Sequence, residues 1–219
     1  MTTPLAPAPP ATNGPTPAQR LDAAEQQAQD RIDEALAGVA AAGITGVALL
    51  GLSGAITAAV LAPVQTALGI GASIALSGSN RRRPRDRQLT EQRLPSPVDT
   101  DVEMVLLDAA GRVDAAEDKA AELERVRRRL YRLAVTKIHQ AASAGTLMYA
   151  RWLGLGLQWV TRQDGHACIV CATMHGRRVR PGQAFAPPRG PGIPKLWAGF
   201  QGLPPAHPNC RCRPRVVRT

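Results

Sequence analysis

Apolar side chains recur every three or four positions between Pro17 and Leu36, among Gln, Glu, Asp and Arg. Such spacing places the apolar side chains on one face of a helix and the polar ones on the other. The pattern therefore predicts an amphipathic helix from about Pro17 to Leu36. Its expected buried face consists of Leu21, Ala24, Ala28, Ile32 and Ala35.

An uncharged stretch of 46 residues follows, from Ala35 to Asn80. Its apolar run Val39–Ala62 is long enough to cross a bilayer, since about 20 apolar residues suffice, and Pro63 separates it from a weaker run, Val64–Leu76. The alternative is an Ala/Gly-rich helical hairpin buried within protein, which the high glycine content favours. Contact with a host membrane through residues 39–76 remains open. Small residues expected to allow close helix contact are Gly38, Gly43, Gly46, Gly51 and Gly54.

A second helical pattern runs from Val98 to about Leu153, where apolar residues recur with a period near 3.6. We expect Gly111 and Gly145 to interrupt it. A stripe of this kind is usually a packing face, so we assign it to structure or self-association and not to chemistry. The stripe consists of Val113, Ala116, Ala120, Leu123, Leu130 and Ala134.

The amino-acid composition changes after Gly154, where proline and glycine become frequent. Residues 158–161, 177–180 and 213–217 are typical of short strands separated by loops. The expected fold class is therefore α+β, with a helical N-terminal region followed by a small Gly/Pro-rich domain. The expected divisions are a disordered Pro-rich arm (1–17), an Ala/Gly-rich helical region (18–80), a basic linker (81–97), a long amphipathic helical region (98–153) and the C-terminal domain (154–219).

The net charge of +10 is concentrated at one end of the chain. Residues 1–150 contain 16 basic and 16 acidic side chains, whereas residues 151–219 contain 11 basic side chains and one acid, Asp164. A basic region of this kind attracts DNA, RNA or anionic lipid through counterion release, although it is also compatible with a merely solvated surface. Aromatic residues make up 3% of the chain and begin only at Tyr131, which excludes an aromatic-centred enzyme core in the N-terminal half.

All four cysteines lie in the C-terminal domain, in two groups. Cys168 and Cys171 form a Cys-x-x-Cys knuckle, and a second group supplies His207, Cys210 and Cys212. We expect no export signal in the first 17 residues, so the thiols would meet a reducing cytosol, which favours a metal over disulfides. Cysteine pairs of this spacing bind tetrahedral Zn²⁺. A domain with so few large apolar side chains needs a cross-link of this kind to stay folded.

The ligand set is only partly fixed by the spacing. Cys168, Cys171 and Cys210 are the favoured ligands, with either His207 or Cys212 as the fourth. Four protein ligands would make the site structural, because catalytic zinc keeps one position open for water. Disulfides formed after release from the cell and unligated thiols are the alternatives. We expect Asp164 to cap a turn or orient the knuckle from behind the ligands.

The cysteine groups belong to a longer ordered series of motifs, which follows a helical segment, Thr136–Gly145. The series consists of Trp159-Val160-Thr161-Arg162-Gln163-Asp164, Cys168-x-x-Cys171, Gly176, Phe185 and Pro204-Pro205-x-His207-Pro208-Asn209-Cys210-Arg211-Cys212. In this order it resembles the C-terminal domain of Mu-F-like head-morphogenesis proteins, which are minor capsid proteins of tailed phages. The similarity covers about residues 134–215, although Lys137 stands where the family commonly has Glu.

The resemblance implies a low-copy structural protein in the virion, inside the phage head and near the portal, made in the host cytoplasm. Its partners would be portal and capsid proteins and packaged double-stranded DNA, with which it could be delivered. Contacts to DNA would address phosphates and not bases, because no recognition helix is evident. The arginines expected to make them are Arg177, Arg178, Arg180, Arg189, Arg211, Arg213 and Arg215.

An enzyme is the less favoured interpretation. Asp164 is the only carboxylate after Glu124, which excludes hydrolysis by paired carboxylates in the C-terminal domain. A nucleophile built from Cys168 and His175 is conceivable, but a metal site explains the cysteine better. We therefore expect no catalytic residue. The alternatives are a bacterial membrane protein with a cytosolic zinc module and a zinc-fold nuclease or toxin-related domain.

Overall fold

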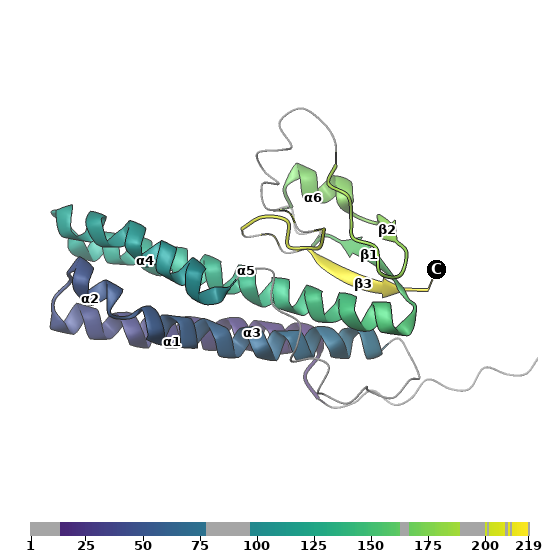
Figure 1. The fold of residues 1–219 in the computed structure, drawn as a ribbon, viewed down its shortest axis with the longest axis horizontal. Coiled ribbons are helices and arrows are strands. Elements are labelled where there is room, and N and C mark those ends of the chain that lie inside the picture. Colours follow the sequence, from purple (N-terminus) through teal and green to yellow (C-terminus); the bar gives the residue numbers. More distant parts are fainter. Residues whose placement is uncertain are drawn as a thin grey trace, which may run out of the picture.

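The computed structural model describes residues 14–77, 97–162, 167–188, 200, 202–208, 210 and 212–218, and these residues form six helices and a small sheet. Four long helices lie side by side in an elongated bundle, and the sheet sits against one end of it (Figure 1). The helices of the bundle are α1 (Pro17–Ala42), α2 (Gly46–Leu50), α3 (Ser53–Leu76), α4 (Val98–Ala115) and α5 (Lys119–Leu153). The Pro-rich arm before residue 14 and almost all of the basic linker lie outside the described residues.

The first helix begins where the sequence predicts and ends later. Thr16 caps it: the Thr16 hydroxyl accepts a hydrogen bond from the Gln19 amide (3.2 Å), and the Thr16 amide donates to the Gln19 side chain (2.8 Å). This capping box satisfies amides that the helix itself leaves without partners. The helix continues to Ala42 because the apolar pattern continues through Leu36 and Val39, both buried. It ends at Gly43, whose φ of 108° disfavours any side chain.

The second helical region is divided at a different place from the one predicted. Gly111 and Gly145 do not interrupt it, since they lie inside α4 and α5. The chain breaks instead at residues 116–118, where Asp118 caps α5 by accepting from the Ala121 amide (2.9 Å). An Asp at this position is a strong N-cap, which explains why the new helix begins there.

Close packing of α3 on α5 depends on two glycines that we did not single out for this role. A Cβ at Gly71 would lie 1.9 Å from the Ala142 carbonyl oxygen, and one at Gly145 would lie 2.2 Å from that of Leu68. The expectation for the N-terminal glycines is largely wrong: a Cβ at Gly38, Gly43 or Gly54 would have no neighbour within 4 Å. A Cβ at Gly51 would make only ordinary contacts within its own turn, and Gly46 alone is tightly packed, against Ala110 and Asp114.

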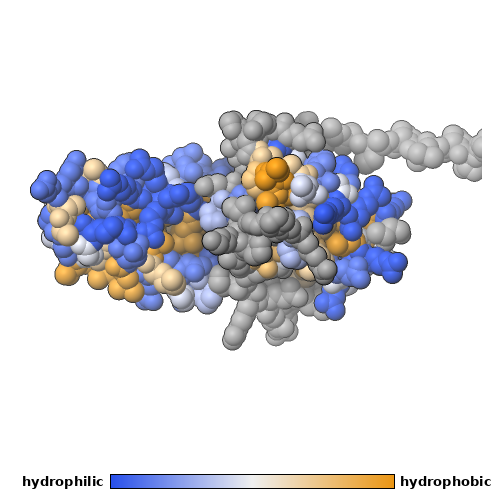
Figure 2. Space-filling model, turned by 90° about the horizontal axis from the view of Figure 1, so that it is seen from above, coloured by the Kyte–Doolittle hydropathy of each residue, from blue (hydrophilic) through white to orange (hydrophobic). Residues whose placement is uncertain are grey.

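Within the described residues, one segment, Gly46–Leu76, is long enough to cross a membrane and contains an 18-residue window with a mean hydropathy of 2.1. One face of α3 is buried against α1, α4 and α5, and 33% of the most apolar window is buried, so the choice between a protein-buried and a membrane-contacting helix stays a prediction. Hydrophobic side chains do reach the surface at one edge of the bundle (Figure 2). The large exposed ones on α2, α3 and α4 are Val47, Leu50, Leu61, Met104 and Leu107.

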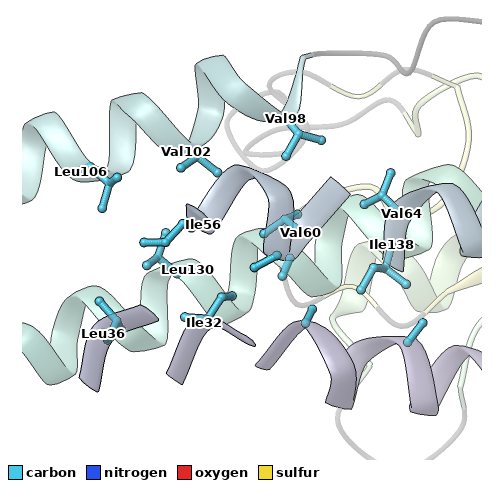
Figure 3. Packing of buried hydrophobic residues seen from close by; sticks show 14 of the residues in the cluster. Ile32, Leu36, Ile56, Val60, Val64, Val98, Val102, Leu106, Leu130 and Ile138 are labelled. Carbon is cyan, nitrogen blue, oxygen red and sulfur yellow. The ribbon is translucent and has the colours of Figure 1, made fainter. Parts of the chain in front are cut away.

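The core of the bundle is aliphatic. Side chains from α1, α3, α4 and α5 converge between the helices (Figure 3). Branched side chains spaced by three and four residues interlock well between helices, and no aromatic ring is needed at the centre. Those labelled in the figure are Ile32, Leu36, Ile56, Val60, Val64, Val98, Val102, Leu106, Leu130 and Ile138.

The C-terminal module contains an antiparallel three-stranded sheet in the order β2-β1-β3 and one short helix, α6 (Ile169–Met174). The strands are β1 (Gly156–Val160), β2 (Arg178–Val179) and β3 (Arg213–Val217), which confirms the three predicted strands to within two residues. A left-handed residue, Gly154, ends α5 and turns the chain into β1. The architecture of mostly helices followed by a small sheet agrees with the predicted α+β class.

Candidate metal centre

The first thiol pair is held by the start of α6. Cys168 is the N-cap residue of this helix, and its sulfur accepts a hydrogen bond from the Cys171 amide (3.3 Å). One turn of backbone therefore aims both sulfurs toward the same side. Cys171 is buried and Cys168 is half-buried, so the pair lies at the edge of the module's core.

The second group lies on the segment that leads into β3 and folds back onto the first pair. His207 Nε2 lies 3.1 Å from the sulfur of Cys168 and 3.3 Å from that of Cys171. The sulfurs of Cys171 and Cys210 are 3.6 Å apart. The Cys210 amide donates to the His207 carbonyl (3.1 Å), which tightens the turn between the two side chains. The prediction that both groups meet is confirmed.

These separations fit a tetrahedral ion. With Zn–S bonds of about 2.3 Å and Zn–N bonds of about 2.0 Å, the edges of the tetrahedron would be about 3.8 Å between sulfurs and about 3.5 Å between sulfur and nitrogen. The observed contacts are of that length or a few tenths of an ångström shorter. Five side chains form two overlapping groups that could hold a metal, and Cys171 belongs to both. The groups are Cys168, Cys171 and His207, and Cys171, Cys210 and Cys212.

The imidazole of His207 is oriented for this role. Its Nδ1 lies 2.8 Å from the Pro208 carbonyl oxygen. A carbonyl can only accept, so Nδ1 carries the proton and Nε2 faces the thiols with its lone pair. A backbone carbonyl behind the imidazole is the usual partner of a histidine that ligates a metal.

Thr161 supports the cluster from behind and was not assigned a role from the sequence. Its buried hydroxyl donates to the Cys171 carbonyl (2.7 Å) and accepts from the Cys212 thiol (3.4 Å). The signal was present: Thr161 follows buried Trp159 at the two-residue spacing of a strand, so a polar group was to be expected on the core face. The Thr161 amide also donates to His175 Nδ1 (3.1 Å), which gives that turn residue a structural role.

The three buried thiols share charge unequally. Hydrogen bonds from Cys171 and then Cys212 lower the pKa of Cys210 to about 2, which favours a thiolate at this sulfur. The bond to Cys210 and the neighbouring thiols, together with burial, raise the pKa of Cys171. At Cys212 the hydrogen bond with Cys171 lowers the pKa, but Cys210 and burial outweigh it and raise the pKa to about 11. A second thiolate is therefore unfavourable unless a cation compensates it.

The cluster borders a small aromatic core. Trp159 meets Phe185 edge to face at 5.4 Å between ring centroids and contacts Phe200 at 6.0 Å. Cys171, Cys210 and Cys212 belong to the same buried cluster as these rings. The four cysteines, all within the described part of the chain, are free thiols in this structure.

The predicted phosphate-contacting arginines are brought only partly together. Arg178 and Arg215 lie on either side of Gln158 in the sheet register, and Arg213 lies on the same face opposite Val160. Arg215 donates to the Gln158 side chain (3.1 Å from Nε). We call Arg178, Arg213 and Arg215 the basic sheet face. Arg177 and Arg180 are exposed beside β2, whereas Asp164, Arg189 and Arg211 lie outside the described residues.

Comparisons with protein-family models, with curated proteins and with solved structures give no match to this chain. The site must therefore be interpreted from its own geometry and from the motifs that the chain carries.

Proposed function

We propose that the cluster holds a structural Zn²⁺ ion ligated by Cys168, Cys171, His207 and Cys210. The supporting observation is the continuous series of short contacts through these four side chains, from Cys168 to His207, Cys171 and Cys210. Thiolate and imidazole donors suit zinc, and four protein ligands leave no position for a reacting water. Cys212 is the remaining thiol, because its sulfur is engaged by Thr161.

Such an ion would join α6 to the segment before β3, two parts of the chain that lie 39 residues apart. Because the unfolded chain offers no preformed site, the free energy of metal binding becomes folding energy, on the order of 10 kcal/mol for small zinc modules. The ion would thereby hold the sheet and the aromatic core in place.

Metal content of the full chain tests the ligand set. We expect one zinc per wild-type chain by elemental analysis, and none after Cys171→Ser or His207→Ala, since each removes a proposed ligand. Cys212→Ser is the matched control and should retain the ion. Loss of zinc from Cys212→Ser together with its retention in His207→Ala would replace His207 by Cys212 in the site. A wild-type chain that is folded and contains no metal would contradict the proposal.

At the level of the whole chain, we infer a structural minor capsid protein of a tailed phage, located inside the head near the portal. The support is the ordered motif series that resembles the Mu-F-like family and the folding of its closing His-Pro-x-Cys-Arg-Cys segment onto the Cys-x-x-Cys pair. The proposal assigns no enzymatic activity. The bundle would contact portal or capsid proteins, and the basic sheet face would contact packaged DNA without reading its sequence.

Mass spectrometry of purified particles tests this assignment. We expect the polypeptide at a few copies per DNA-filled head, and a comparison with emptied particles would reveal whether it leaves with the genome. Its absence from particles, together with retention in host membranes after a carbonate wash, would favour the alternative of a membrane protein with a zinc module. The uncharged segment Gly46–Leu76 is the feature that keeps this alternative in view.

A further inference from the structure

A hollow of about 370 Å³ opens on the bundle between α4 and α5, away from the metal centre. Every described residue that lines it is charged, and all but one are arginines. We call it the arginine hollow. Its lining consists of Arg112 from α4 and Glu122, Arg125, Arg128, Arg129 and Arg132 from α5.

Part of this lining is fixed by ion pairs. Glu122, whose side chain is 4% exposed, accepts from Arg112 (2.8 Å) and from Arg125 (2.7 Å). Asp108 accepts from Arg112 (2.7 Å) and from Arg129. The two carboxylates therefore hold three guanidinium groups in position at the rim of the hollow, those of Arg112, Arg125 and Arg129. Such networks restrict long side chains that would otherwise be mobile.

The network leaves an excess of positive charge. Five guanidinium groups surround two carboxylates, so three formal positive charges are not compensated within the hollow. Arg128 and Arg132 make no ion pair in the described part of the chain, and the Arg132 Nε only donates to the Arg128 carbonyl (3.3 Å). On α5 the four arginines are three or four residues apart, a spacing at which like charges repel. An anion in the hollow would relieve this repulsion.

The chemistry of the lining selects among anions. The hollow offers fork-shaped donors that suit phosphate oxygens, but no aromatic or aliphatic side chain on which a base or a lipid chain could rest. Single-stranded nucleic acids are usually bound on aromatic platforms, whereas a duplex keeps its bases stacked inside and presents rows of phosphates along its outer edges. The arginines of α5 extend over two turns, about 10 Å, which is enough to meet more than one phosphate.

We propose that the arginine hollow binds the phosphate backbone of a nucleic-acid duplex. This site is separate from the basic sheet face, because its lining residues lie on α4 and α5 of the bundle and none belongs to the C-terminal module. The hydrophilic surface that covers much of this end of the molecule is visible in Figure 2. Arg128 and Arg132 make the contacts to phosphate, while Glu122 and Asp108 hold the neighbouring arginines in position.

The test is a salt titration of full-length protein binding to a short duplex DNA of mixed sequence. Arg128→Gln/Arg132→Gln removes two charges and leaves the four ion pairs of the hollow intact. Each phosphate contact contributes about 0.9 to the slope of log affinity against log salt, so the double variant should lower the slope by up to about 1.8. Arg128→Gln alone should lower it by about half as much, which provides a second, milder variant.

Two control variants make the result specific. Arg31→Gln/Arg151→Gln removes the same charge from exposed helical positions outside the hollow and should leave the slope unchanged. Arg178→Gln/Arg213→Gln tests the basic sheet face, so failure of that contact and failure of the hollow are distinguishable. A double variant of the hollow with the wild-type slope would overturn the proposal. So would an equal loss in the Arg31/Arg151 control, or tighter binding to a single strand than to the duplex.

Discussion

The bundle and the C-terminal module are held together by different means. In the bundle, aliphatic side chains from all five of its helices form one continuous buried cluster. In the module, the buried cluster is much smaller, and three of its members are cysteines of the candidate metal centre. Hydrophobic burial alone can therefore support the bundle, whereas we expect the module to depend on the proposed metal cross-link between its two halves. The predictions below test this division, beginning with the largest effect.

Removal of the metal should unfold the module and leave the bundle folded. We expect a chelator, or Cys171→Ser without one, to expose Trp159 to water, because about 10 kcal/mol of binding energy is lost from a small core. The helical circular dichroism signal should largely persist. Tryptophan fluorescence and circular dichroism, recorded on the same sample, provide the measurement. Loss of both signals together would mean that the two regions share one folding unit.

Gly145→Ala should destabilise the bundle through overpacking. The new Cβ would lie 2.2 Å from the Leu68 carbonyl oxygen, and neither helix can shift without opening the core. We expect a loss of about 1–3 kcal/mol in the free energy of unfolding, measured by urea denaturation. Gly54→Ala is the matched control: its Cβ meets no neighbour, and the helix should gain up to about 1 kcal/mol. Equal effects from both variants would argue against close packing of α3 on α5.

Acid should weaken the bundle through Glu122. Arg112 and Arg125 hold the pKa of this carboxyl below its usual value, so its contribution is present above the unfolded pKa and is lost as the pH falls through the lower folded pKa. We expect Glu122→Gln to be less stable than the wild type at neutral pH and to approach it in acid. Urea denaturation at several pH values would show this. A difference that does not depend on pH would mean that the ion pairs contribute nothing.

The smallest expected effect is at the start of α1. Thr16→Ala removes the capping hydroxyl and should cost about 1 kcal/mol of bundle stability, without any change in metal content. Thermal unfolding followed by circular dichroism would detect it. Thr16→Ser, which keeps the hydroxyl, is the control and should behave like the wild type.

Periodicity along the chain was sufficient to predict most of the helices and all three strands. Apolar residues recur every three or four positions in a helix and every second position in a strand, and both patterns can be recognised in the sequence. The breaks predicted at Gly111 and Gly145 were wrong. A helix tolerates a glycine in its interior, and at Gly145 the absence of a side chain allows α3 to pack closely. The true break at residues 116–118 follows a capping signal, Asp118, that is weaker in the sequence than a glycine.

The approach of the two Cys/His groups could be predicted, because the candidate ligands are few and chemically distinctive. Thr161 was missed although it follows Trp159 at the spacing of a strand, because alternation alone does not tell which face of the strand borders the thiols. The arginine hollow was hidden for another reason. Over residues 1–150 the charges cancel, and only the packing of α4 on α5 brings Arg112 beside the arginines of one helix face.

The wide spacing between Cys168 and His207 has a practical consequence. Lengthening a closed loop costs little, about 0.6 kcal/mol for each doubling, so extra residues between the two anchor points should be tolerated. The exposed turn at Pro181 and Gly182 is a suitable place to insert a short reporter peptide. A tag at that turn would allow the polypeptide to be located by antibody labelling, without alteration of either end of the chain.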